Sequence, residues 1–587
     1  MTRRRRAIDN AMVARALREM ALFLEMQEVP FKPRAYEKAA RTVQALERPL
    51  AQIEVESGLR GIDALPGIGK GIAERILELL HTGRMAELER QRDALPIDVL
   101  GLTAIEGVGP KLAVALHREL GVRDVRDLER ACQNGAVRGL AHFGEKTEQK
   151  ILRGIGFLAR GSGRALLGDA LALARVIEAR LRGVPGVQHA AAAGSVRRRR
   201  ETVGDLDFVV AARDTPRVIL AFVEMPEVAH VTARGHTKAL VRLASGMDAD
   251  LRVVPQASFG AALAYFTGSV AHNVALRRIA RQRGLKLNEY GLYRGSRRVA
   301  GRSEEEIYDA LDLAFVPAEL REDQGEIDAA RAGRLPVLIE YGALRGDLQV
   351  QTDWSDGAAS IEEMARAARS LGLEYIAITD HTRDLRVAHG NDEKRLMQQV
   401  ESIHALNRKL RGFRVLTGAE VNIRGDGTLD IADAALAQLE VVGAAVHSAF
   451  RQSRRDMTRR VIRAIENPHV DILFHPTARA LGQREPVSLD IDAVIEAAAR
   501  TGTVLEVDGI PERLDLKDEH VRKAVNAGVA LAIDSDAHRV GQLACADTLG
   551  VAVARRGWAR ASDVINALPA SRCLARLKDA QTRRRRR

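Results

Sequence analysis

The second half of the chain alternates short apolar runs with helical segments, and this alternation restricts its possible folds more than any other feature. The runs include YIAITDH (375–381), FRVLTGAEV (413–421) and ALAIDSDAH (530–538). Repeated strand and helix units of this kind place their strands parallel in one sheet or barrel. We therefore predict a parallel sheet or barrel that extends to about residue 577.

The first half shows two other patterns. From residue 10 to about 157, apolar residues recur at helical spacing, which predicts small helical domains. Runs at 205–212, 238–244 and 249–254 then indicate strands of a mixed α/β unit. Proline, glycine and charged residues predict a linker at 321–335. A chain of 587 residues is too long for one core, so these parts form several domains.

The chain carries a formal net charge of +12, which favours a polyanionic partner such as nucleic acid. Arginine runs at 3–6 and 583–587 contribute to this charge, and solvated tails would explain them equally well. No apolar run approaches the roughly 20 residues of a membrane span. Cys132, Cys545 and Cys573 have no CxxC spacing, so we expect neither disulfides nor structural zinc, and a reducing cytoplasm.

Two segments share a pattern in which two glycines form a turn that opens a helix: LPGIGKGIAERI (65–76) and IEGVGPKLAVAL (105–116). Such a turn exposes backbone N–H groups and the positive end of a helix to an anion, such as a DNA phosphate. A glycine turn between packed helices would explain one match, but the repetition predicts helix-hairpin-helix elements that hold the DNA backbone. The predicted contacts are Gly67, Gly69, Lys70, Gly107, Gly109 and Lys111, with Lys146 in a looser third match at 140–152.

The segment GSVRRRRETVGDLDFVV (194–210) predicts a site for phosphoryl transfer. Asp205 and Asp207 project from the same face of a strand, where two close negative charges need a cation between them. Paired Mg²⁺ ions held in this way can activate the attacking oxygen and stabilise the leaving oxygen. Gly194 and Ser195 supply donors for a triphosphate, and Arg198 can neutralise it. An exposed strand edge is the alternative explanation of two aspartates alone.

A third carboxylate is expected on a neighbouring strand, where DADLRVV offers Asp248 and Asp250. The pattern GS-x-RR-x(2)-E-x(2)-GDLD resembles the signature of family X DNA polymerases, the family of DNA polymerase beta. The family's D-[LIF]-R motif selects Asp250 as the third metal ligand and leaves Asp248 as a turn residue. The resemblance implies catalysis by Asp205, Asp207 and Asp250 with Mg²⁺ or Mn²⁺.

The segment YFTGSVAHNVALRR (265–278) is similar to the family's thumb motif, and KLNEYGLY (286–293) matches the segment that follows it. This similarity implies that Tyr265, Phe266 and Gly268 contact the nucleotide sugar, Asn273 the incoming base and Arg277 the templating strand. The resemblance covers most of residues 8–320. It divides the chain into a DNA-end-binding, lyase-like domain (1–90), a fingers-type domain (91–157), a nucleotidyltransferase palm (158–260) and a thumb-type domain (261–320).

One departure from the family concerns the first hairpin, where lyase-competent relatives carry a lysine that forms a Schiff base with a 5′-deoxyribose phosphate. The matching residue here is Arg75. A guanidinium group stays protonated and cannot act as that nucleophile. We therefore expect lyase activity to be weak or absent, with Lys70 as the nearby candidate for a substitute amine.

Residue types that bind metals follow the apolar runs of the second half at successive strand ends. A barrel gathers the carboxyl ends of its strands at one face, so residues remote in sequence can share one metal pocket. A single histidine would more often be a surface or core residue, but a series of this length favours a metal site. The candidates are Asp356, His381, Glu420, His447, His475, Asp536 and His538.

The motifs ITDH, GAE, AAVHS, FHPTAR and DSDAH resemble those of the PHP domain, which is found fused to bacterial family X polymerases. The resemblance implies a distorted β/α barrel over 336–577, up to three Zn²⁺ or Mn²⁺ ions, and removal of nucleotides from DNA 3′ ends. Relatives have an H-x-H motif where this chain has Gln349 and Gln351. An amide oxygen is a poor substitute for imidazole toward zinc, so we expect one weakened metal position and reduced 3′-5′ exonuclease activity.

The sequence thus predicts a multidomain α and α/β protein that ends in a basic tail (578–587). The expected function is DNA-directed DNA polymerisation that fills gaps in DNA repair, of the base-excision or end-joining type. The expected partners are gapped or nicked DNA and dNTPs, and the expected state is a monomer in the cytoplasm, associated with the nucleoid. Two alternatives remain: a nucleotidyltransferase for RNA or a small molecule, and a non-catalytic scaffold for DNA ends.

Overall fold

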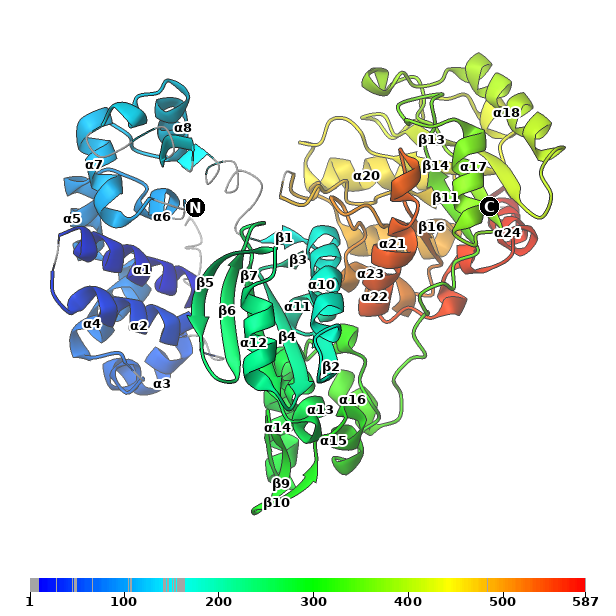
Figure 1. Ribbon diagram of the computed structural model, residues 1–587. Helices are drawn as coiled ribbons and strands as arrows, with labels where there is room; N and C mark the ends of the chain where they lie inside the picture. Colours follow the sequence, from blue (N-terminus) through cyan, green and yellow to red (C-terminus); the bar gives the residue numbers. More distant parts are fainter. Residues whose placement is uncertain are drawn as a thin grey trace. The chain divides into compact units, whose positions relative to one another are not determined.

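In the computed structural model the chain forms two compact units, residues 1–163 and 164–587 (Figure 1). The structure describes residues 10–27, 29–44, 46, 50–65, 67–103, 105, 108–140, 144, 147–149, 151–152, 155, 164–482 and 484–585. Among the helices formed by these residues, none is long and apolar enough to cross a membrane.

The first unit is helical, as the sequence predicts. Helix α1 packs against α2, and α3 packs against α4. One apolar core joins them to the later helices and includes Leu17, Ile76 and Leu116, all fully buried. The helices are α1 (Asn10–Met26), α2 (Lys32–Gln44), α3 (Leu50–Asp63), α4 (Lys70–Thr82), α5 (Ala86–Ala94), α6 (Val99–Thr103), α7 (Pro110–Leu120) and α8 (Val125–Gln133).

The second unit begins with a five-stranded mixed sheet in the order β2-β4-β7-β6-β5. Strands β4 and β7 are parallel, and the other neighbours are antiparallel. Along β4, Leu206 and Phe208 enter the core formed with α10 and α12, so Asp205 and Asp207 lie on the opposite face. The elements are α10 (Leu167–Arg182), β2 (Val187–Ala192), α11 (Gly194–Arg197), β4 (Asp205–Ala212), α12 (Thr215–Val223), β5 (Val228–Arg234), β6 (Lys238–Leu243) and β7 (Asp248–Val254), with a small ladder of β1 (Ala165–Leu166) and β3 (Thr202–Val203).

A thumb-type part follows, with its own core around Leu276, Leu292 and Tyr308. Ile327 and Ala330 also belong to this core, so the segment predicted as a linker begins with packed structure. Helix α13 contacts β4 on the face that carries the aspartates. The elements are α13 (Phe259–Thr267), α14 (Val270–Gln282), β8 (Lys286–Asn288), β9 (Gly291–Arg294), β10 (Arg297–Ala300), α15 (Glu304–Ala310), η3 (Ala318–Leu320) and α16 (Glu326–Arg331).

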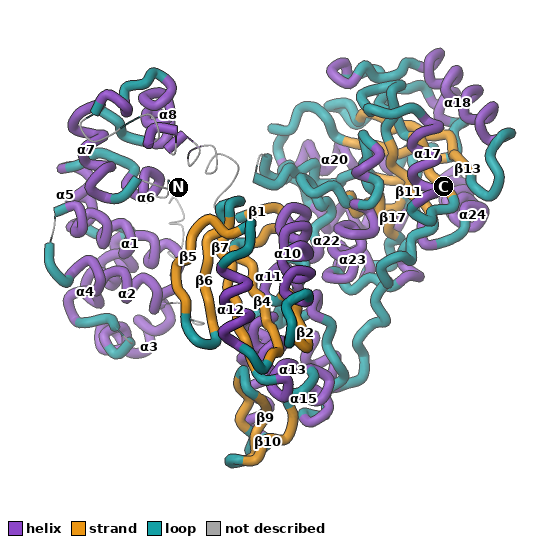
Figure 2. The backbone as a smooth tube through the Cα atoms, in the orientation of Figure 1, coloured by secondary structure: helices purple, strands orange, loops and turns teal. Residues whose placement is uncertain are grey.

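Seven parallel strands, β11 to β17, pair in sequential order and form a nearly closed barrel (Figure 2). The last strand approaches the first, because the backbone N–H of Gln351 donates to the carbonyl of Ala537 at 2.9 Å. The predicted distorted β/α barrel is therefore confirmed. The elements are β11 (Gly346–Val350), α17 (Ile361–Ser370), β12 (Tyr375–Ile378), α18 (Glu393–Asn407), β13 (Arg414–Asn422), α19 (Asp433–Leu436), β14 (Val441–Ala445), α20 (Arg454–Ile465), β15 (Ile472–Leu473), α21 (Ile491–Thr501), β16 (Val504–Asp508), α22 (Asp518–Asn526), β17 (Leu531–Asp534) and α23 (Val551–Arg556).

The last helix, α24 (Ala570–Arg585), runs into the segment predicted as a basic tail. Its first half is held on the barrel, because Cys573, Leu574 and Leu577 share a core with Tyr375 of β12 and Phe474 beyond β15. The residues that follow Leu577 continue the same helix as far as Arg585.

Candidate functional site

Three aspartates converge on the face of the mixed sheet that is opposite α10 and α12. The parallel register of β4 and β7 places Asp207 beside Asp250 and Asp205 beside Asp248. Residues two apart share a face of a strand, so Asp205, Asp207 and Asp250 lie together. The structure therefore brings together the three carboxylates that the sequence predicted as catalytic.

The three carboxylates repel one another in partly buried surroundings. Burial, and then the charges of Asp205 and Asp250, raise the pKa of Asp207 to about 7. Burial also raises the pKa of Asp250, against the effect of Arg252, whose Nε lies 3.2 Å from Asp250 Oδ1. A divalent cation would relieve this repulsion, and hard carboxylate oxygens are the ligands that Mg²⁺ and Mn²⁺ prefer. The donor set therefore fits the predicted ions.

Asp248 differs from Asp250 because an arginine of the adjacent strand holds both of its carboxylate oxygens. Nε and Nη2 of Arg242 on the adjacent strand donate to the two oxygens of Asp248 at 2.5 and 3.0 Å. Asp248 is also the first residue of β7, so the prediction of a turn residue is wrong. The strand begins one residue earlier than expected, and Asp248 lies opposite Arg242 in the antiparallel ladder with β6.

A glycine allows the turn at Gly194 and Ser195, which the sequence predicts to bind the triphosphate, to approach the aspartates. Gly194 has a φ of 59°, and a Cβ at this position would lie 2.1 Å from Asp207 Oδ2. The preceding Ala193 N–H donates to the carbonyl of Asp207 at 2.8 Å. The hydroxyl of Ser195 is buried and has no hydrogen-bond partner among the described residues. Ser195 is thus beside the aspartates with an unused donor, as a phosphate-binding residue would be.

Arg198 lies in an ion-pair network with the thumb-type part. Its Nε donates to Glu322 Oε1 at 3.1 Å, and its Nη1 donates to the carbonyl of Thr267. The preceding Arg197 forms a two-point contact with buried Glu304, at 2.9 and 2.6 Å. Two successive arginines therefore connect the predicted triphosphate-binding turn to the thumb-type part.

The predicted thumb residues cluster at the junction of α13 and α14. The side-chain amide of Asn273 donates to the carbonyl of Tyr265 at 2.7 Å, and Nε of Arg277 donates to the carbonyl of Asn273 at 3.3 Å. The rings of Tyr265 and Phe266 meet edge to face with centroids 5.2 Å apart. Gly268 has a φ of 70°, and a Cβ there would lie 3.1 Å from Arg198 Nη1. These contacts link the thumb residues to Arg198.

The glycine turns of the first unit open helices as predicted. Gly69 and Gly109 are the N-caps of α4 and α7, and neither helix start has a side-chain cap. Lys70 is the first residue of α4, and Lys111 is the second of α7. Gly67 has a φ of 81°, whereas Gly107 and Lys146 lie outside the described residues. The uncapped N–H groups at both helix starts could bind an anion.

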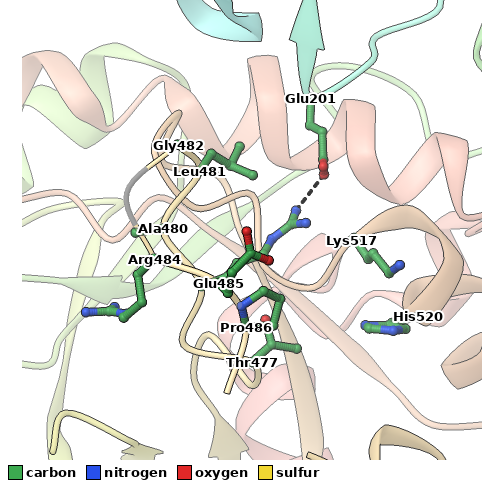
Figure 3. Close-up of a pocket in the computed structure, with 11 residues that line it drawn as sticks. Glu201, Thr477, Ala480, Leu481, Gly482, Arg484, Glu485, Pro486, Lys517 and His520 are labelled. Carbon is green, nitrogen blue, oxygen red and sulfur yellow. Dashed lines mark hydrogen bonds and ion pairs between the residues drawn. The ribbon is translucent and has the colours of Figure 1, made fainter. Parts of the chain in front are cut away.

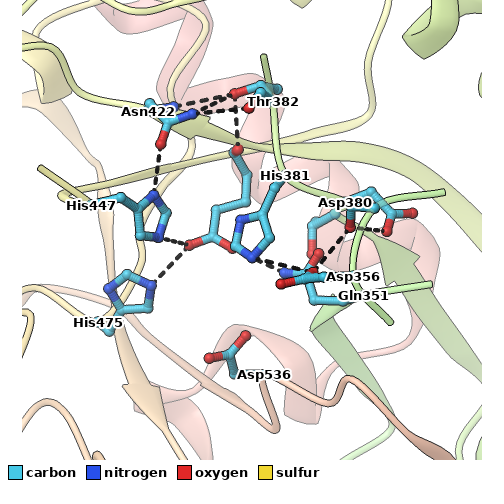
Figure 4. A network of polar contacts seen from close by, with 12 residues as sticks. Gln351, Asp356, Asp380, His381, Thr382, Asn422, His447, His475 and Asp536 are labelled. Atoms are coloured by element: carbon cyan, nitrogen blue, oxygen red, sulfur yellow. Dashed lines mark hydrogen bonds and ion pairs between the residues drawn. The ribbon is translucent and has the colours of Figure 1, made fainter. Parts of the chain in front are cut away.

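The barrel gathers histidines and carboxylates at the carboxyl ends of its strands (Figure 4). One group consists of Asp356, His381 and His538, and a second consists of His381, Glu420 and His447. Within each group the ligand atoms lie within 4.8 Å of one another. His381 belongs to both groups, and either group could hold a metal ion.

The two remaining predicted ligands border these groups. His475 Nε2 lies 2.8 Å from Glu420 Oε1, and Asp536 Oδ1 lies 3.8 Å from His538 Nδ1. Burial lowers the pKa of His381 and of His475 to about 4, so both imidazoles are neutral, as metal ligands must be. Asp536 Oδ1 is buried without a hydrogen-bond partner among the described residues, which fits an open ligand position.

Both glutamines that replace the expected histidines face carboxylates. Nε2 of Gln351 donates to Glu420 Oε2 at 2.9 Å, and its own carbonyl oxygen is buried without a partner among the described residues. The amide nitrogen of Gln349, in the orientation that satisfies it, donates to Glu506 at 2.5 and 3.2 Å. Gln349 is therefore used in a structural contact, and Gln351 leaves only one neutral oxygen for a metal.

Sequence analysis missed the residues that orient these ligands. Asn422 accepts a contact from His447 Nδ1 at 2.8 Å and donates to the carbonyl of Thr382 at 3.2 Å (Figure 4). It follows Glu420 by two residues on β13, so strand periodicity was the available signal. Asp380 accepts a hydrogen bond from the Thr352 hydroxyl at 2.6 Å and thus links the first two strand ends.

A pocket of about 530 Å³ lies where the mixed-sheet and barrel parts of the second unit meet (Figure 3). Glu201, at the end of the arginine run, forms an ion pair there with Arg479 at 2.8 Å. The pocket is also lined by Arg484, Lys517 and His520. None of the predicted metal ligands lines this pocket. The pocket shows that charged side chains connect the mixed-sheet part with the barrel part.

Family models match four parts of the chain. The Helix-hairpin-helix domain matches residues 8–85, and the SAM-like Helix-hairpin-helix tandem matches 99–156. The DNA polymerase beta thumb matches 262–322, and the PHP domain matches 347–497. The matched regions have the order and the types that the sequence motifs predict.

The chain is similar over nearly its whole length to the DNA polymerase/3′-5′ exonuclease PolX of Bacillus subtilis. The two are 39% identical over 560 residues, which cover 94% of this chain and 97% of that protein. A "Probable phosphatase" of Thermoanaerobacter sp. is 31% identical over 192 residues, 31% of this chain and 73% of that protein. Another, of Syntrophotalea carbinolica, is 34% identical over 166 residues, 28% of this chain and 64% of that protein.

The approach of Gly194 to Asp207 leads to a stability prediction. Gly186 has a similar backbone, with a φ of 89°, but a Cβ there would meet nothing within 4 Å. We expect Gly186→Ala to lower the free energy of unfolding by about 1 kcal/mol, the cost of a left-handed backbone. Gly194→Ala adds overpacking against Asp207 and should cost about 3 kcal/mol. Urea unfolding of both variants measures the difference, and equal losses would contradict the proposed close approach.

Proposed function

Because the chain belongs to the family X DNA polymerases that carry a C-terminal PHP domain, we propose that it is a DNA-directed DNA polymerase for gap filling in DNA repair. The observation that carries the proposal is the convergence of Asp205, Asp207 and Asp250 on adjoining parallel strands. Helix-hairpin-helix elements before the sheet and a thumb after it support DNA as the substrate. A nucleotidyltransferase for a small molecule would need neither of them.

The residues that would hold Mg²⁺ or Mn²⁺ in the polymerase site are Asp205, Asp207 and Asp250. Such ions supply the positive charge that activates the attacking oxygen and stabilises the leaving oxygen. The chain itself positions the nucleotide: Ser195 and the backbone of Gly194 donate to the triphosphate, and Arg198 neutralises it. Tyr265, Phe266 and Gly268 contact the sugar, Asn273 the base and Arg277 the templating strand.

The first unit holds the DNA backbone without reading bases. The helix starts at Gly69 and Gly109 present backbone N–H groups that no side chain of the described residues caps, and Lys70 and Lys111 add positive charge. A net charge of +12 supports binding of gapped or nicked DNA. We assign the repair activity to the base-excision or end-joining type, and we place the protein, as a monomer, with the DNA at the nucleoid in the cytoplasm.

The barrel carries a weakened 3′-5′ exonuclease site. Asp356, His381, Glu420, His447 and His538 would hold Zn²⁺ or Mn²⁺, since mixed nitrogen and oxygen donors suit both ions. Such ions supply an activated water and stabilise charge on the phosphate. His475 and Asp536 border the same pocket, whereas Gln349 and Gln351 provide no imidazole. The site thus keeps most of its predicted ligands and lacks both histidines of the H-x-H motif.

Primer extension on gapped DNA tests the polymerase proposal. We expect Asp205→Ala and Asp250→Ala to lower nucleotide incorporation by about a thousandfold or more, because each removes a metal ligand. DNA binding should be retained, since these carboxylates do not contact the duplex. Asp248→Ala is the matched control. It removes the aspartate two residues before Asp250, which is paired with Arg242, and incorporation should persist. Near-normal incorporation by Asp205→Ala would refute the site.

Borohydride trapping on a 5′-deoxyribose phosphate end tests the lyase prediction. Arg75 lies 3.6 Å from Glu78 and 3.9 Å from Glu87, so a lysine placed there would stay largely protonated. We expect no trapping of the natural protein and partial trapping of Arg75→Lys. Strong trapping of the natural protein that Lys70→Ala removes would show that Lys70 is the nucleophile instead.

Restoring the two histidines tests the weakened barrel site. We expect Gln349→His with Gln351→His to increase the bound metal and to raise 3′-end cleavage at least about tenfold, as added ligands strengthen the site. Metal content and exonuclease rate are measured together. Gln438→His adds a histidine on the exposed surface and should change neither quantity. If the double variant also changes neither, another group already completes the third position.

A further inference from the structure

The end of helix α23 in the barrel part joins the end of the thumb-type part through two arginines. Arg555 Nε donates to Glu319 Oε1 at 2.8 Å, and Arg556 Nη1 donates to Glu322 Oε1 at 3.1 Å. Glu322 is the same carboxylate that pairs with Arg198 of the polymerase site. One acidic side chain therefore connects the PHP domain with the triphosphate-binding turn.

Arg556 is held rigidly in this position. Its side chain is 4% exposed, and its Nη2 donates to Asp518 at the start of α22 at 2.5 Å. Its Nη1 also donates to the backbone carbonyl of Arg198 at 2.7 Å. Arg556 thus contacts the turn twice, directly at the Arg198 backbone and indirectly through Glu322. A buried guanidinium with this many acceptors keeps a single orientation.

The segment that carries Glu322 is equally fixed. The neighbouring Arg321 is fully buried and donates to Glu304 at 2.5 Å, and its carbonyl accepts from Ser269 N–H at 3.0 Å. These contacts hold the backbone beside Glu322 in place. The Glu322 carboxylate lies between two guanidinium groups, those of Arg198 and Arg556.

We propose that Arg556 of the PHP domain is a positioning residue of the polymerase site. Arg556 shares Glu322 with Arg198 and so leaves Arg198 able to bind the nucleotide triphosphate. The inference rests on the proposed polymerase function. Two guanidinium groups divide the charge of Glu322, and each is held less strongly than it would be alone. Without Arg556, Glu322 would hold Arg198 more tightly, and the Arg198 carbonyl would lose a donor. Both effects oppose triphosphate binding.

Steady-state incorporation of one dNTP on gapped DNA tests this inference with the full chain. We expect Arg556→Ala to raise the KM for dNTP about tenfold, the effect of one charge-assisted contact, with a smaller change in kcat. Glu322→Gln alone should not raise KM, because it releases Arg198. Glu322→Gln in the Arg556→Ala background should return KM most of the way to its natural value.

The matched control is Arg555→Ala. Arg555 precedes Arg556 on the same helix and crosses the same junction, but it contacts Glu319 and the carbonyl of Ile339. If docking of the PHP domain alone mattered, Arg555→Ala and Arg556→Ala would raise KM equally, and Glu322→Gln would not rescue. Either result would overturn the inference, as would an unchanged KM for Arg556→Ala.

Two measurements keep the outcomes distinct. Thermal unfolding of each variant identifies any loss of fold. If Arg556→Ala is unfolded, the Glu322→Gln variant decides the inference, and a raised KM of Glu322→Gln refutes it. Absence of incorporation by the natural protein would refute the proposed polymerase function instead. Normal incorporation with an unaffected Arg556→Ala would refute only the role of Arg556.

Discussion

Repulsion between carboxylates that are withdrawn from water is the constraint on which both sites of this protein depend. In the polymerase site, burial and then the charges of Asp205 and Asp250 raise the pKa of Asp207 to about 7. In the barrel, burial and neighbouring carboxylates raise the pKa of Glu506 and Asp508 well above the usual range. Such clusters are stable only where cations or hydrogen-bond donors compensate them. The rest of each fold supplies that compensation.

The two sites meet this constraint with different scaffolds. In the mixed sheet, the parallel strands β4 and β7 place Asp207 beside Asp250. Because Gly194 has no side chain, its turn can lie in contact with Asp207. In the barrel, the predicted ligands come from the ends of six of the seven strands and lie at one face. Asn422 contacts His447, and Asp380 links the ends of β11 and β12. The sheet site is therefore local and compact, whereas the barrel site depends on ring closure.

Buried ion pairs carry the connection between the parts of the second unit. Burial alone would raise the pKa of Glu304, but the guanidinium groups of Arg197 and Arg321 lower it to about 2. A carboxylate that is ionised in the interior requires both arginines, and these lie on different elements. The same logic extends to the PHP domain through Glu322 and Arg556. Charge compensation thus joins the turn at Gly194 and Ser195, the thumb and the barrel.

Some of this organisation could be predicted from local sequence. Period-two spacing placed Asp205 and Asp207 on one face, glycine pairs marked the helix starts, and ligands at successive strand ends indicated a barrel. These features depend on backbone geometry over a few residues, which a sequence pattern records. The family resemblance added Asp250, and the parallel register of β4 and β7 agrees with it.

The sequence by itself therefore determined the types of domain, their order and the principal carboxylates and histidines. Only the tertiary structure decided that Asp248 is paired with Arg242, that Gln351 holds Glu420, and that Arg556 reaches Glu322. Each of these contacts joins residues on different elements, and the last joins residues 234 positions apart. Such pairs arise from packing and burial of charge, which no periodicity of a single strand or helix records.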